Sequence, residues 1–329
     1  MNYSGKKVLV TGASGFIGSR LTERLVELGA DVRAFVHYNS RSDYGLLEVL
    51  PREVLSQVEI FPGDLKDGDG VRKAVKGCDT VFHLGALIAI PYSYRNPFDF
   101  VQANVIGTAN VLNAALEYET GRIVHTSTSE TYGTAQYQPI DEKHPLVGQS
   151  PYSASKIGAD KLAESYWLSY DLPVATIRPF NTYGPRQSAR AVIPTIISQA
   201  LVGDTLHIGS TDPKRDFNYV DDTVSGFLAV AEHDAALGEV INVGSGRTVS
   251  IADVIEAVGT ITGKQLKVVT DPSRIRPGKS EVGLLLADTR KAAELLGWKP
   301  EVPLEEGLRR TVEWIAANSA RYKPQIYNV

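Results

Sequence analysis

Tyr152 and Lys156 are the two side chains of this sequence whose types and spacing most directly suggest catalysis. Residues 151–170 have a helical pattern, and Pro151 stands in the first turn, where its missing N–H costs nothing. Two residues four positions apart share one face of a helix. A tyrosine hydroxyl, with an ordinary pKa of about 10, is a poor base near neutral pH. A neighbouring ammonium stabilises the phenolate and lowers that pKa, so the pair could take a proton from a hydroxyl.

A run of polar residues directly after a predicted strand strengthens the case that this pair is catalytic. The strand covers residues 122–126, and the run reads Ser127-Thr128-Ser129-Glu130. Active sites of α/β proteins gather at the carboxyl ends of strands, so we expect this run beside Tyr152 and Lys156. The Tyr-x-x-x-Lys spacing is common by chance, and the polar run is what gives it weight. The alternative for Glu130 is an ordinary surface or helix-capping residue.

A glycine-rich turn near the N-terminus has the form of a phosphate-binding loop. It follows a predicted strand at residues 8–11 and opens a predicted helix at residues 16–28. Glycines here permit a tight turn, let the backbone approach a pyrophosphate and allow close helix–strand packing. The free N–H groups of the helix start would face the anion. The residues predicted to hold a dinucleotide are Gly12, Ser14, Gly15, Phe16, Ile17 and Gly18.

The end of the second predicted strand, residues 31–36, bears on the choice of cofactor. Sites for NAD commonly place an acidic residue there to bind the ribose 2′-hydroxyl. Here residues 36–42 contain Arg41 and no acid, which favours a 2′-phosphate and therefore NADP. The alternative is that Arg41 is a solvated loop residue and NAD binds without the carboxylate. Asp64, after the third strand, could bond the adenine amine or cap a helix.

The elements that must position these groups alternate between short β-branched runs and longer helical patterns. Such alternation implies parallel pairing and right-handed crossovers, hence a Rossmann-type doubly wound α/β sheet. The predicted strands are residues 8–11, 31–36, 58–61, 80–83, 122–126 and 174–178. The predicted helices are residues 16–28, 67–76, 98–117 and 151–170.

The regular alternation of strand and helix patterns becomes less clear after about Pro185. We predict a dinucleotide-binding domain with the catalytic residues over 1–185, and a smaller C-terminal α/β substrate lobe over 186–329. The boundary is interleaved, since no Ser/Gly linker separates the two. The elements predicted in the lobe are a strand at 239–243 and helices at 193–202, from Ser250, at 289–296 and at 304–318.

Composition limits the partners and the location of the protein. With 34 Lys+Arg against 38 Asp+Glu, the net charge of −4 gives no reason to expect nucleic acid or an anionic membrane as partner. The single cysteine, Cys78, excludes an internal disulfide, and six scattered histidines give no reason to expect a metal. No apolar run approaches the ~20 residues of a membrane span. Since residues 1–7 lack a signal pattern, we expect a cytoplasmic protein.

Several motifs together resemble one enzyme family. Gly-x-x-Gly-x-x-Gly at 12–18, Tyr152-x-x-x-Lys156 and later landmarks occur in the family's order, and the similarity covers nearly the whole chain. The family is the extended short-chain dehydrogenases/reductases, among which the sugar-nucleotide members match best. The further motifs are His83-Leu84-Gly85-Ala86, Arg178-Pro179-Phe180-Asn181-x-Tyr183-Gly184-Pro185, Arg215-Asp216-Phe217-x-Tyr219-Val220-x-Asp222, Asn242-x-Gly244 and Arg276-Pro277-Gly278.

The resemblance also implies further residues and partners. It implies a tightly bound, recycled NAD or NADP, a nucleotide-sugar substrate, and a homodimer formed through residues 98–117 and 151–170. Asn104 would help to hold the catalytic geometry, and His83 would end a core strand near the cofactor rather than act as acid or base. The further cofactor contacts would be Asn39, Asp64, Leu65, Leu84 and Ala86. The substrate contacts would be Asn181, Arg215 and Arg276, which face the diphosphate, together with Arg190.

Within the family, the run at residues 127–133 divides activities. It resembles the Thr-Ser-Glu of GDP-mannose 4,6-dehydratases and the Thr-Asp-Glu of dTDP-glucose 4,6-dehydratases, whereas 4-epimerases usually carry small or apolar residues where Glu130 stands. Residues 86–94 and 181–190 resemble the nucleotide-N-acetylglucosamine 4,6-dehydratases of legionaminic-acid-type pathways. The resemblance therefore implies a 4,6-dehydratase, with UDP- or GDP-N-acetylglucosamine as the expected substrate.

The implied reaction assigns a role to each polar group. Tyr152, helped by Lys156, takes the proton of the sugar 4-hydroxyl, and Thr128 bonds the same oxygen. The C5 proton is acidic only after C4 becomes a ketone, and a carboxylate such as Glu130 can then remove it. The 6-hydroxyl leaves as water with a proton from Glu130 or Ser129. Since Ser129 stands where dTDP-glucose enzymes carry Asp, both donors stay open.

Two other functions compete with this hypothesis. A UDP-sugar 4-epimerase needs Tyr152 and Lys156 but not Glu130, so the glutamate discriminates the two enzymes. A non-catalytic dinucleotide-binding regulator would turn over no sugar nucleotide, and the intact Tyr, Lys and Thr set argues against it.

Overall fold

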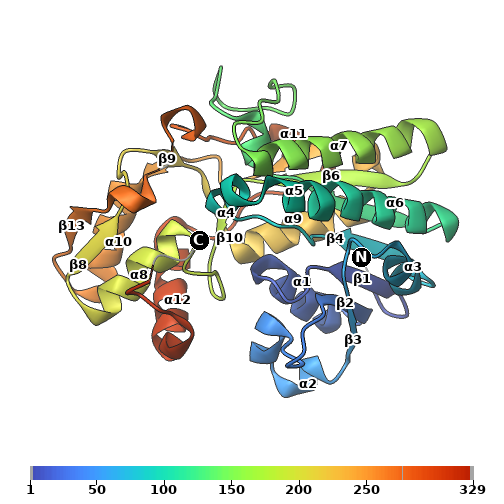
Figure 1. Cartoon of the computed structure of the whole chain (residues 1–329), viewed down its shortest axis with the longest axis horizontal. Coiled ribbons are helices and arrows are strands. Elements are labelled where there is room, and N and C mark those ends of the chain that lie inside the picture. The colour runs from blue at the N-terminus through green and yellow to red at the C-terminus, as the bar shows by residue number, and fades with distance from the viewer. Residues whose placement is uncertain (1–2, 276, 327–329) are drawn as a thin grey trace.

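A seven-stranded parallel sheet forms the centre of the larger part of the molecule. The computed structural model describes residues 3–275 and 277–326. The strand order is β11-β6-β5-β4-β1-β2-β3, and every neighbouring pair is parallel. The Rossmann-type fold is thus confirmed (Figure 1). The strands are β1 (Lys7–Thr11), β2 (Asp31–His37), β3 (Val58–Gly63), β4 (Thr80–His83), β5 (Arg122–Thr126), β6 (Val174–Pro179) and β11 (Val240–Val243).

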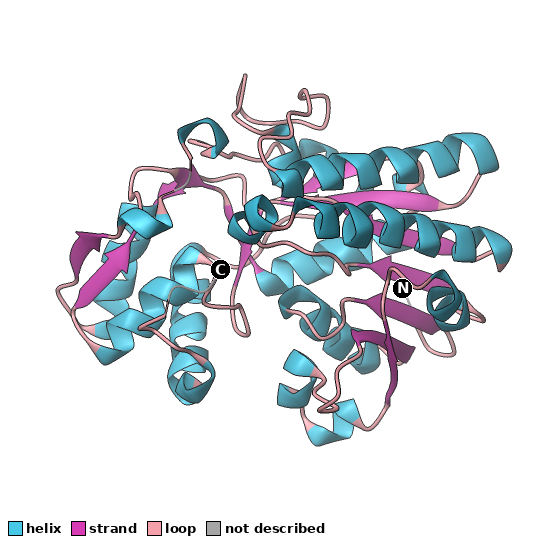
Figure 2. Cartoon of the chain, in the orientation of Figure 1, coloured by secondary structure: helices cyan, strands magenta, loops and turns pink. Residues whose placement is uncertain are grey.

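Helices cover both faces of this sheet (Figure 2). Successive residues of β1 point to opposite faces. Val8 and Val10 pack with Leu21 and Leu25 of α1, whereas Leu9 joins the core under the other helices. The covering helices are α1 (Phe16–Glu27) and α9 (Val220–Glu232) on one face, and α3 (Gly68–Val75), α6 (Gly107–Glu117) and α7 (Pro151–Tyr170) on the other. The sequence prediction missed α9.

The helix predicted over 98–117 is an unbroken series of three helical segments that differ in their type of helix. It begins as α5 (Pro97–Phe100), continues through a π-helical segment at Val101–Ile106, and ends as α6. π-helical turns are frequent at functional sites. Cys78 is buried, as a small core residue would be.

The C-terminal part of the chain builds a smaller α/β lobe beside the sheet (Figure 1). Its helix α10 (Ile251–Thr262) begins at Ser250 with the predicted capping box through Asp253. Its other helices are α8 (Val192–Val202) and α12 (Leu304–Ala317), whereas α11 (Arg290–Leu296) packs against the edge strand β11 of the large sheet (Figure 1). Its strand pairs are β8 (Thr205–Ile208) with β13 (Lys267–Thr270), β9 (Lys214–Arg215) with β12 (Val249–Ser250), and β7 (Asn181–Tyr183) with β10 (Phe217–Tyr219).

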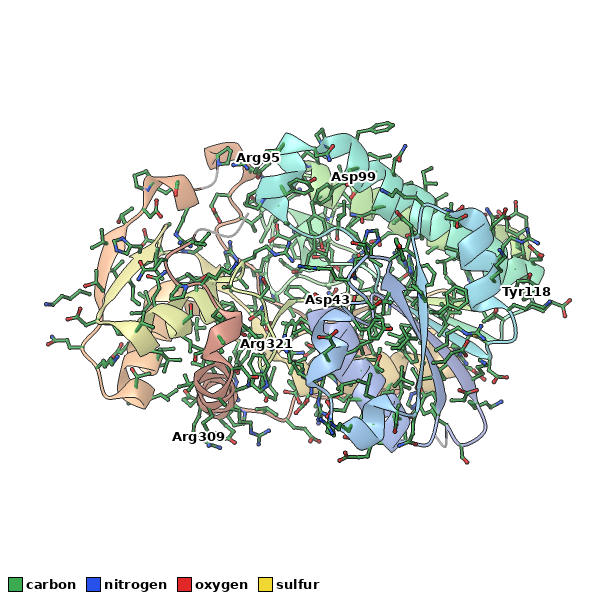
Figure 3. All side chains as sticks on the ribbon, turned by 60° about the horizontal axis from the view of Figure 1, so that its bottom comes forward. Asp43, Arg95, Asp99, Tyr118, Arg309 and Arg321 are labelled. Carbon is green, nitrogen blue, oxygen red and sulfur yellow. The ribbon has the colours of Figure 1, made fainter. Side chains whose placement is uncertain are left out.

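The two halves of the sequence are interleaved in space. Both β11 and α9 follow residue 185, yet they lie at the edge and on one face of the large sheet. Two short helices, α2 (Arg52–Leu55) before β3 and α4 (Ile90–Arg95) after β4, complete the connections. Charged side chains project outward around the molecule, as Arg309 does from α12 (Figure 3). Among the described residues, no helix is long and apolar enough to cross a bilayer.

Candidate active site

The order of the strands places one crevice at the carboxyl ends of β1 and β4. From β1 the chain continues outward to β2 and β3 on one side, while β4, β5 and β6 extend on the other. Ligands of open α/β sheets bind where the strand order reverses in this way. The glycine-rich loop follows β1, the Leu84-Gly85-Ala86 segment follows β4, and the Ser127–Glu130 run follows β5. The fold therefore brings the predicted groups to one edge of the sheet.

The glycine-rich loop is packed too closely to carry side chains at two of its glycines, and its bare backbone can approach an anion. Gly12 has φ +70°, and a Cβ there would lie 2.8 Å from the backbone nitrogen of Gly85. A Cβ on Gly18 would collide with the carbonyl oxygen of Gly12. Gly15 caps α1 without any side-chain hydrogen bond, so the first N–H groups of the helix stay available for a ligand. The loop thus fits the pyrophosphate of a dinucleotide.

Three of the predicted cofactor residues, Asn39, Arg41 and Asp64, differ in the hydrogen bonds and ion pairs that they make. Asn39 Oδ1 accepts the backbone N–H groups of Arg41 (3.0 Å) and Asp43 (3.1 Å), so its side chain braces its own loop. Arg41 is 80% exposed and lies 3.5 Å from the Asp43 carboxylate. Asp64 accepts the backbone N–H of Lys66 at 2.9 Å, which is a turn-capping contact.

The remaining predicted cofactor residues lie around the glycine-rich turn. Leu65 packs against Gly85, since a Cβ on that glycine would lie 2.7 Å from Leu65 Cδ1. Leu84 donates its backbone N–H to Thr11 at 3.3 Å. Ser14 accepts the backbone N–H of Leu46 at 3.0 Å, which ties the loop after β2 to the turn. Phe16 and Ile17 open α1 and are half-buried.

Tyr152 and Lys156 lie side by side near the start of α7. Ser150 caps this helix through a reciprocal bond with Ser153, and Pro151 stands at its first position, so the start of the helix is fixed. Both side chains are buried, with 7% of Tyr152 and 4% of Lys156 exposed. The ring of Phe100 meets the ring of Tyr152 edge-on, with 6.2 Å between the centroids. This packing orients the phenol.

Burial dominates the electrostatics of both groups. It lowers the pKa of Lys156 to about 8, against the opposing charge of Asp160. It raises the pKa of Tyr152 above its ordinary value, and the charges of Glu130 and Asp160 add to this rise, while a hydrogen bond with Thr128 lowers it. The sequence-based expectation of a lowered tyrosine pKa is therefore wrong for the side chains alone. A positive charge close to the phenol, from the ammonium of Lys156 or from a ligand, would lower it.

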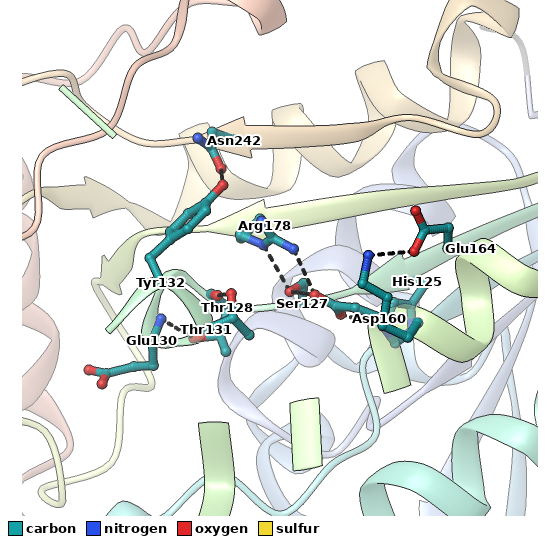
Figure 4. Close-up of polar contacts among 11 residues, drawn as sticks. His125, Ser127, Thr128, Glu130, Thr131, Tyr132, Asp160, Glu164, Arg178 and Asn242 are labelled. Carbon is teal, nitrogen blue, oxygen red and sulfur yellow. Dashed lines mark hydrogen bonds and ion pairs between the residues drawn. The ribbon is translucent and has the colours of Figure 1, made fainter. Parts of the chain in front are cut away.

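The polar run after β5 forms a tight turn. Thr128 caps the short 3₁₀ helix Ser129–Tyr132, and its Oγ1 accepts the backbone N–H of Glu130 at 3.3 Å. The capping side chain is thus Thr128 and not Glu130. Ser129 is buried, and Glu130 is half-buried with its carboxylate on the side of the turn away from Asp160 (Figure 4). Glu130 lies close enough to Tyr152 for its charge to act on the phenol.

Asn104 and His83 hold the surrounding backbone. Asn104, in the π-helical segment, accepts the N–H of Leu87 at 2.8 Å and donates to Ser155 at 2.9 Å, so it ties the loop after β4 to α7. His83 is buried between the hydroxyls of Thr11 (2.8 Å) and Thr108 (3.0 Å). Burial lowers the pKa of His83 well below its ordinary value, which suits a structural side chain.

A cavity of about 260 Å³ is lined by Phe100, the residue whose ring also packs against Tyr152. Its wall is mostly apolar, and Arg190 supplies its charge. The lining residues are Ala86, Leu87, Ile88, Ala89, Tyr92, Phe100 and Arg190. The structure thus brings Ala86 and Arg190, from distant parts of the sequence, to one cavity.

The other predicted substrate residues lie toward the smaller lobe. Asn181, on β7, has a side-chain oxygen that is buried without a hydrogen-bond partner. Arg215, on β9, is buried and donates to Glu281 at 2.9 Å. Arg276 lies outside the described residues. Within 3–275 and 277–326, no group of three or more His, Cys, Asp and Glu side chains could hold a metal.

The sequence prediction missed a buried polar cluster behind Lys156. Its centre is Asp160, which contacts His125, Ser127 and Arg178. Arg178 also lies over the ring of Tyr132, 4.6 Å from its centroid. The available signal was the four-residue spacing, which continues from Tyr152 through Lys156 to Asp160.

Comparisons with known proteins agree with this arrangement. Residues 9–311 match the family described as GDP-mannose 4,6 dehydratase. The chain is 34% identical over 322 residues to the dTDP-glucose 4,6-dehydratase of Streptomyces antibioticus, with 96% of this chain and 94% of the relative covered. It is 30% identical to the putative UDP-glucose 4-epimerase of Methanocaldococcus jannaschii, with 95% and 99% covered.

Solved structures show the same likeness. The DesIV dTDP-glucose 4,6-dehydratase of Streptomyces venezuelae, crystallised with NAD bound, superposes with a TM-score of 0.85 at 29% identity. The match covers 97% of this chain and all of that one. The chain therefore belongs to the GDP-mannose 4,6 dehydratase family of extended short-chain dehydrogenases/reductases.

Proposed function

We propose that the protein is a sugar-nucleotide 4,6-dehydratase, a hydro-lyase that converts a nucleotide-linked hexose to its 4-keto-6-deoxy derivative. The observation that carries this proposal is a carboxylate, Glu130, beside the buried pair of Tyr152 and Lys156. A tyrosine and a lysine suffice to remove the proton of a hydroxyl whose hydride passes to a dinucleotide, whereas loss of water from C5 and C6 needs a further base. The 4,6-dehydratases among the relatives agree with the proposal.

The residues of this chain divide the work of the reaction. The glycine-rich loop holds the dinucleotide, which supplies the hydride acceptor and returns the hydride. Tyr152 takes the proton of the 4-hydroxyl, and Thr128 bonds the same oxygen. Glu130 then takes the proton of C5, and Glu130 or Ser129 gives a proton to the departing 6-hydroxyl. A proton is added back at C5 as the hydride returns to C6.

The substrate we propose is UDP- or GDP-N-acetylglucosamine. This assignment rests on the resemblance of residues 86–94 and 181–190, the first of which contributes to the cavity wall. Asn181, Arg190, Arg215 and Arg276 are the proposed substrate contacts. The orphaned oxygen of Asn181 supports its place in this set, because a buried polar atom without a partner is costly unless a ligand supplies one.

Incubation with a panel of UDP-, GDP- and dTDP-sugars tests the activity. We expect loss of one water from a hexose derivative by mass spectrometry, and incorporation of one deuterium at C5 in deuterated water. A change of configuration at C4 without loss of water would instead identify a 4-epimerase, the activity named for several relatives. No turnover of any sugar nucleotide would favour a non-catalytic regulator.

For the cofactor we propose NADP. The loop after β2 carries Arg41, whose side chain is mostly exposed and pairs with Asp43 only across 3.5 Å. An exposed pair of this kind is weak, so the guanidinium can turn to a 2′-phosphate at little cost. NAD is the cofactor of the S. venezuelae relative, and it is the competing outcome.

Arg41→Ala is expected to weaken NADP binding about ten- to a hundredfold, the loss of one charged hydrogen bond, and to leave NAD binding unchanged. Equilibrium binding of each dinucleotide measures the effect, and Arg52→Ala on α2 is the control. Copurification of NAD alone, or equal binding of NADP by both variants, would contradict the proposal.

A homodimer is also part of the proposal. The adjacent helical segments 97–117 and 151–170 carry exposed apolar side chains, among them Phe98 (69% exposed) and Leu168 (73%). We expect light scattering to give twice the mass of one chain, and Phe98→Asp to shift the mass toward the monomer. Val202→Asp, at an equally exposed position on α8, should keep the dimer. A monomeric parent protein would refute the proposal.

The division into a dinucleotide-binding part over 1–185 and a substrate lobe over 186–329 is likewise proposed. We also propose that the protein is cytoplasmic.

A further inference from the structure

Asp160 is a buried carboxylate to which the proposed reaction assigns no role. It follows Lys156 by four residues and Tyr152 by eight, so all three side chains share one face of α7. Only 5% of it is exposed. A carboxylate is rarely kept in such a place unless other groups pair with it.

Three side chains from two neighbouring strands hold this carboxylate (Figure 4). From the end of β5, His125 Nε2 lies 3.0 Å from Oδ1, and Ser127 Oγ donates to Oδ2 at 2.5 Å. From β6, Arg178 donates to Oδ2 at 2.7 Å and to Ser127 Oγ at 3.1 Å. The carboxylate is therefore fixed in position on both oxygens.

These partners keep Asp160 ionised. Burial alone would raise its pKa, but the hydrogen bond from His125 and the charge of Arg178 hold the pKa well below its ordinary range. Burial lowers the pKa of His125, so this ring is neutral near neutral pH. The cluster thus contains one lasting negative charge and one lasting positive charge, on Asp160 and Arg178.

The groups that face Lys156 come from three elements. His83 on β4 and His125 on β5 are both neutral, because burial lowers their pKa values. On α7 itself, Asp160 supplies the charge that favours the ammonium form of Lys156. The negative charge of Asp160 also opposes ionisation of Tyr152, as does that of Glu130 from the turn after β5.

We propose that Asp160 is a positioning residue for the Tyr152–Lys156 pair: its carboxylate, locked by His125, Ser127 and Arg178, is the counter-charge that keeps Lys156 an ammonium ion beside the phenol. This inference rests on the proposed function, in which Tyr152 is the base. Arg178 is the clamp of this carboxylate.

Asp160→Asn tests the proposal through the pH profile of kcat. Loss of the negative charge makes both the lysine and the tyrosine lose their protons at lower pH. Both limbs of the profile should therefore move toward lower pH by roughly one to three units, the range for a neighbouring charge. Glu164→Gln, an exposed position one turn further along α7, should leave both limbs in place.

A double variant, Asp160→Asn with Arg178→Met, keeps the test sound if the single variant does not fold. It removes the whole buried pair and leaves no unpaired charge in the core. Arg178 lies on the Oδ2 atom of the carboxylate, so its removal cancels part of the field that Asp160 exerts on Lys156 and Tyr152. The double variant should therefore show an acidic displacement in the same direction as the single one, but a smaller one.

A second measurement does not depend on turnover. In protein labelled with ¹³C-lysine, the Cε resonance of Lys156, assigned by its loss in Lys156→Arg, should titrate near pH 8 in the parent protein and at lower pH in both Asp160 variants. Unmoved limbs and an unmoved resonance, with only a lower kcat or melting temperature, would overturn the inference. An inactive parent protein would refute the proposed function, while the resonance would still decide the role of Asp160.

Discussion

Tyr152→Phe is expected to lower kcat by a factor on the order of 10²–10⁴, the usual contribution of a positioned acid or base. The substitution removes the hydroxyl that takes the proton of the sugar 4-hydroxyl and keeps the ring against Phe100, so the fold should be unchanged. Because oxidation at C4 comes first, no reduced dinucleotide should accumulate during a single turnover. Absorbance of the reduced nicotinamide and mass spectrometry of the sugar measure the two effects.

The matched control for this variant lies on the same helix. Tyr170→Phe removes an identical hydroxyl from a side chain that is 56% exposed at the end of α7, and it should keep the parent kcat. If Tyr152→Phe also kept the parent activity, another group would have to be the base, and the proposed roles of Tyr152 and Lys156 would be wrong.

Glu130→Gln is expected to separate oxidation from loss of water. Glutamine keeps the size and the polarity of the side chain but cannot take the C5 proton, so dehydration should fall by about 10²–10⁴-fold. Oxidation at C4 does not need this carboxylate, and reduced dinucleotide should therefore build up when substrate is added. Rapid-mixing absorbance detects this build-up, and quenched samples should contain the 4-keto sugar with its 6-hydroxyl intact.

The exposed Glu164 of α7 supplies the control, since Glu164→Gln changes the same group far from the turn after β5. An epimerase would respond differently to Glu130→Gln, because inversion at C4 needs no base at C5. Full activity of Glu130→Gln would therefore rule out the dehydratase and leave the epimerase.

Much of the sheet could be predicted because parallel strands that are covered on both faces are continuous apolar runs. All four residues of β4 and all six of β6 are buried, and both strands were found within one residue of their ends. The helix α9 was missed for a local reason. It begins at Val220 directly after a strand, its cap Tyr219 makes no side-chain bond, and Gly226 interrupts its pattern.

In the site, contacts between residues close in the sequence could be predicted, whereas contacts between residues far apart in the sequence could not. The spacing of Tyr152 and Lys156 lies within one helix and is visible in the sequence. The partners of Asp160, in contrast, come from β5 and β6, and only the register of the folded sheet brings His125 and Arg178 to it. Burial, which raises rather than lowers the pKa of Tyr152, is likewise a property of the packed molecule.

The strand β11 has a consequence for how the chain reaches its fold. It pairs with β6 at one edge of the sheet, yet it is made more than sixty residues later, after the first elements of the smaller lobe. While the chain emerges from the ribosome, β6 is an uncovered edge, and the core beneath α9 is open to water. Such edges pair readily with other chains. The nascent protein is therefore most prone to aggregate before residue 243 is free, and a fragment that ends near residue 185 would keep this vulnerability permanently.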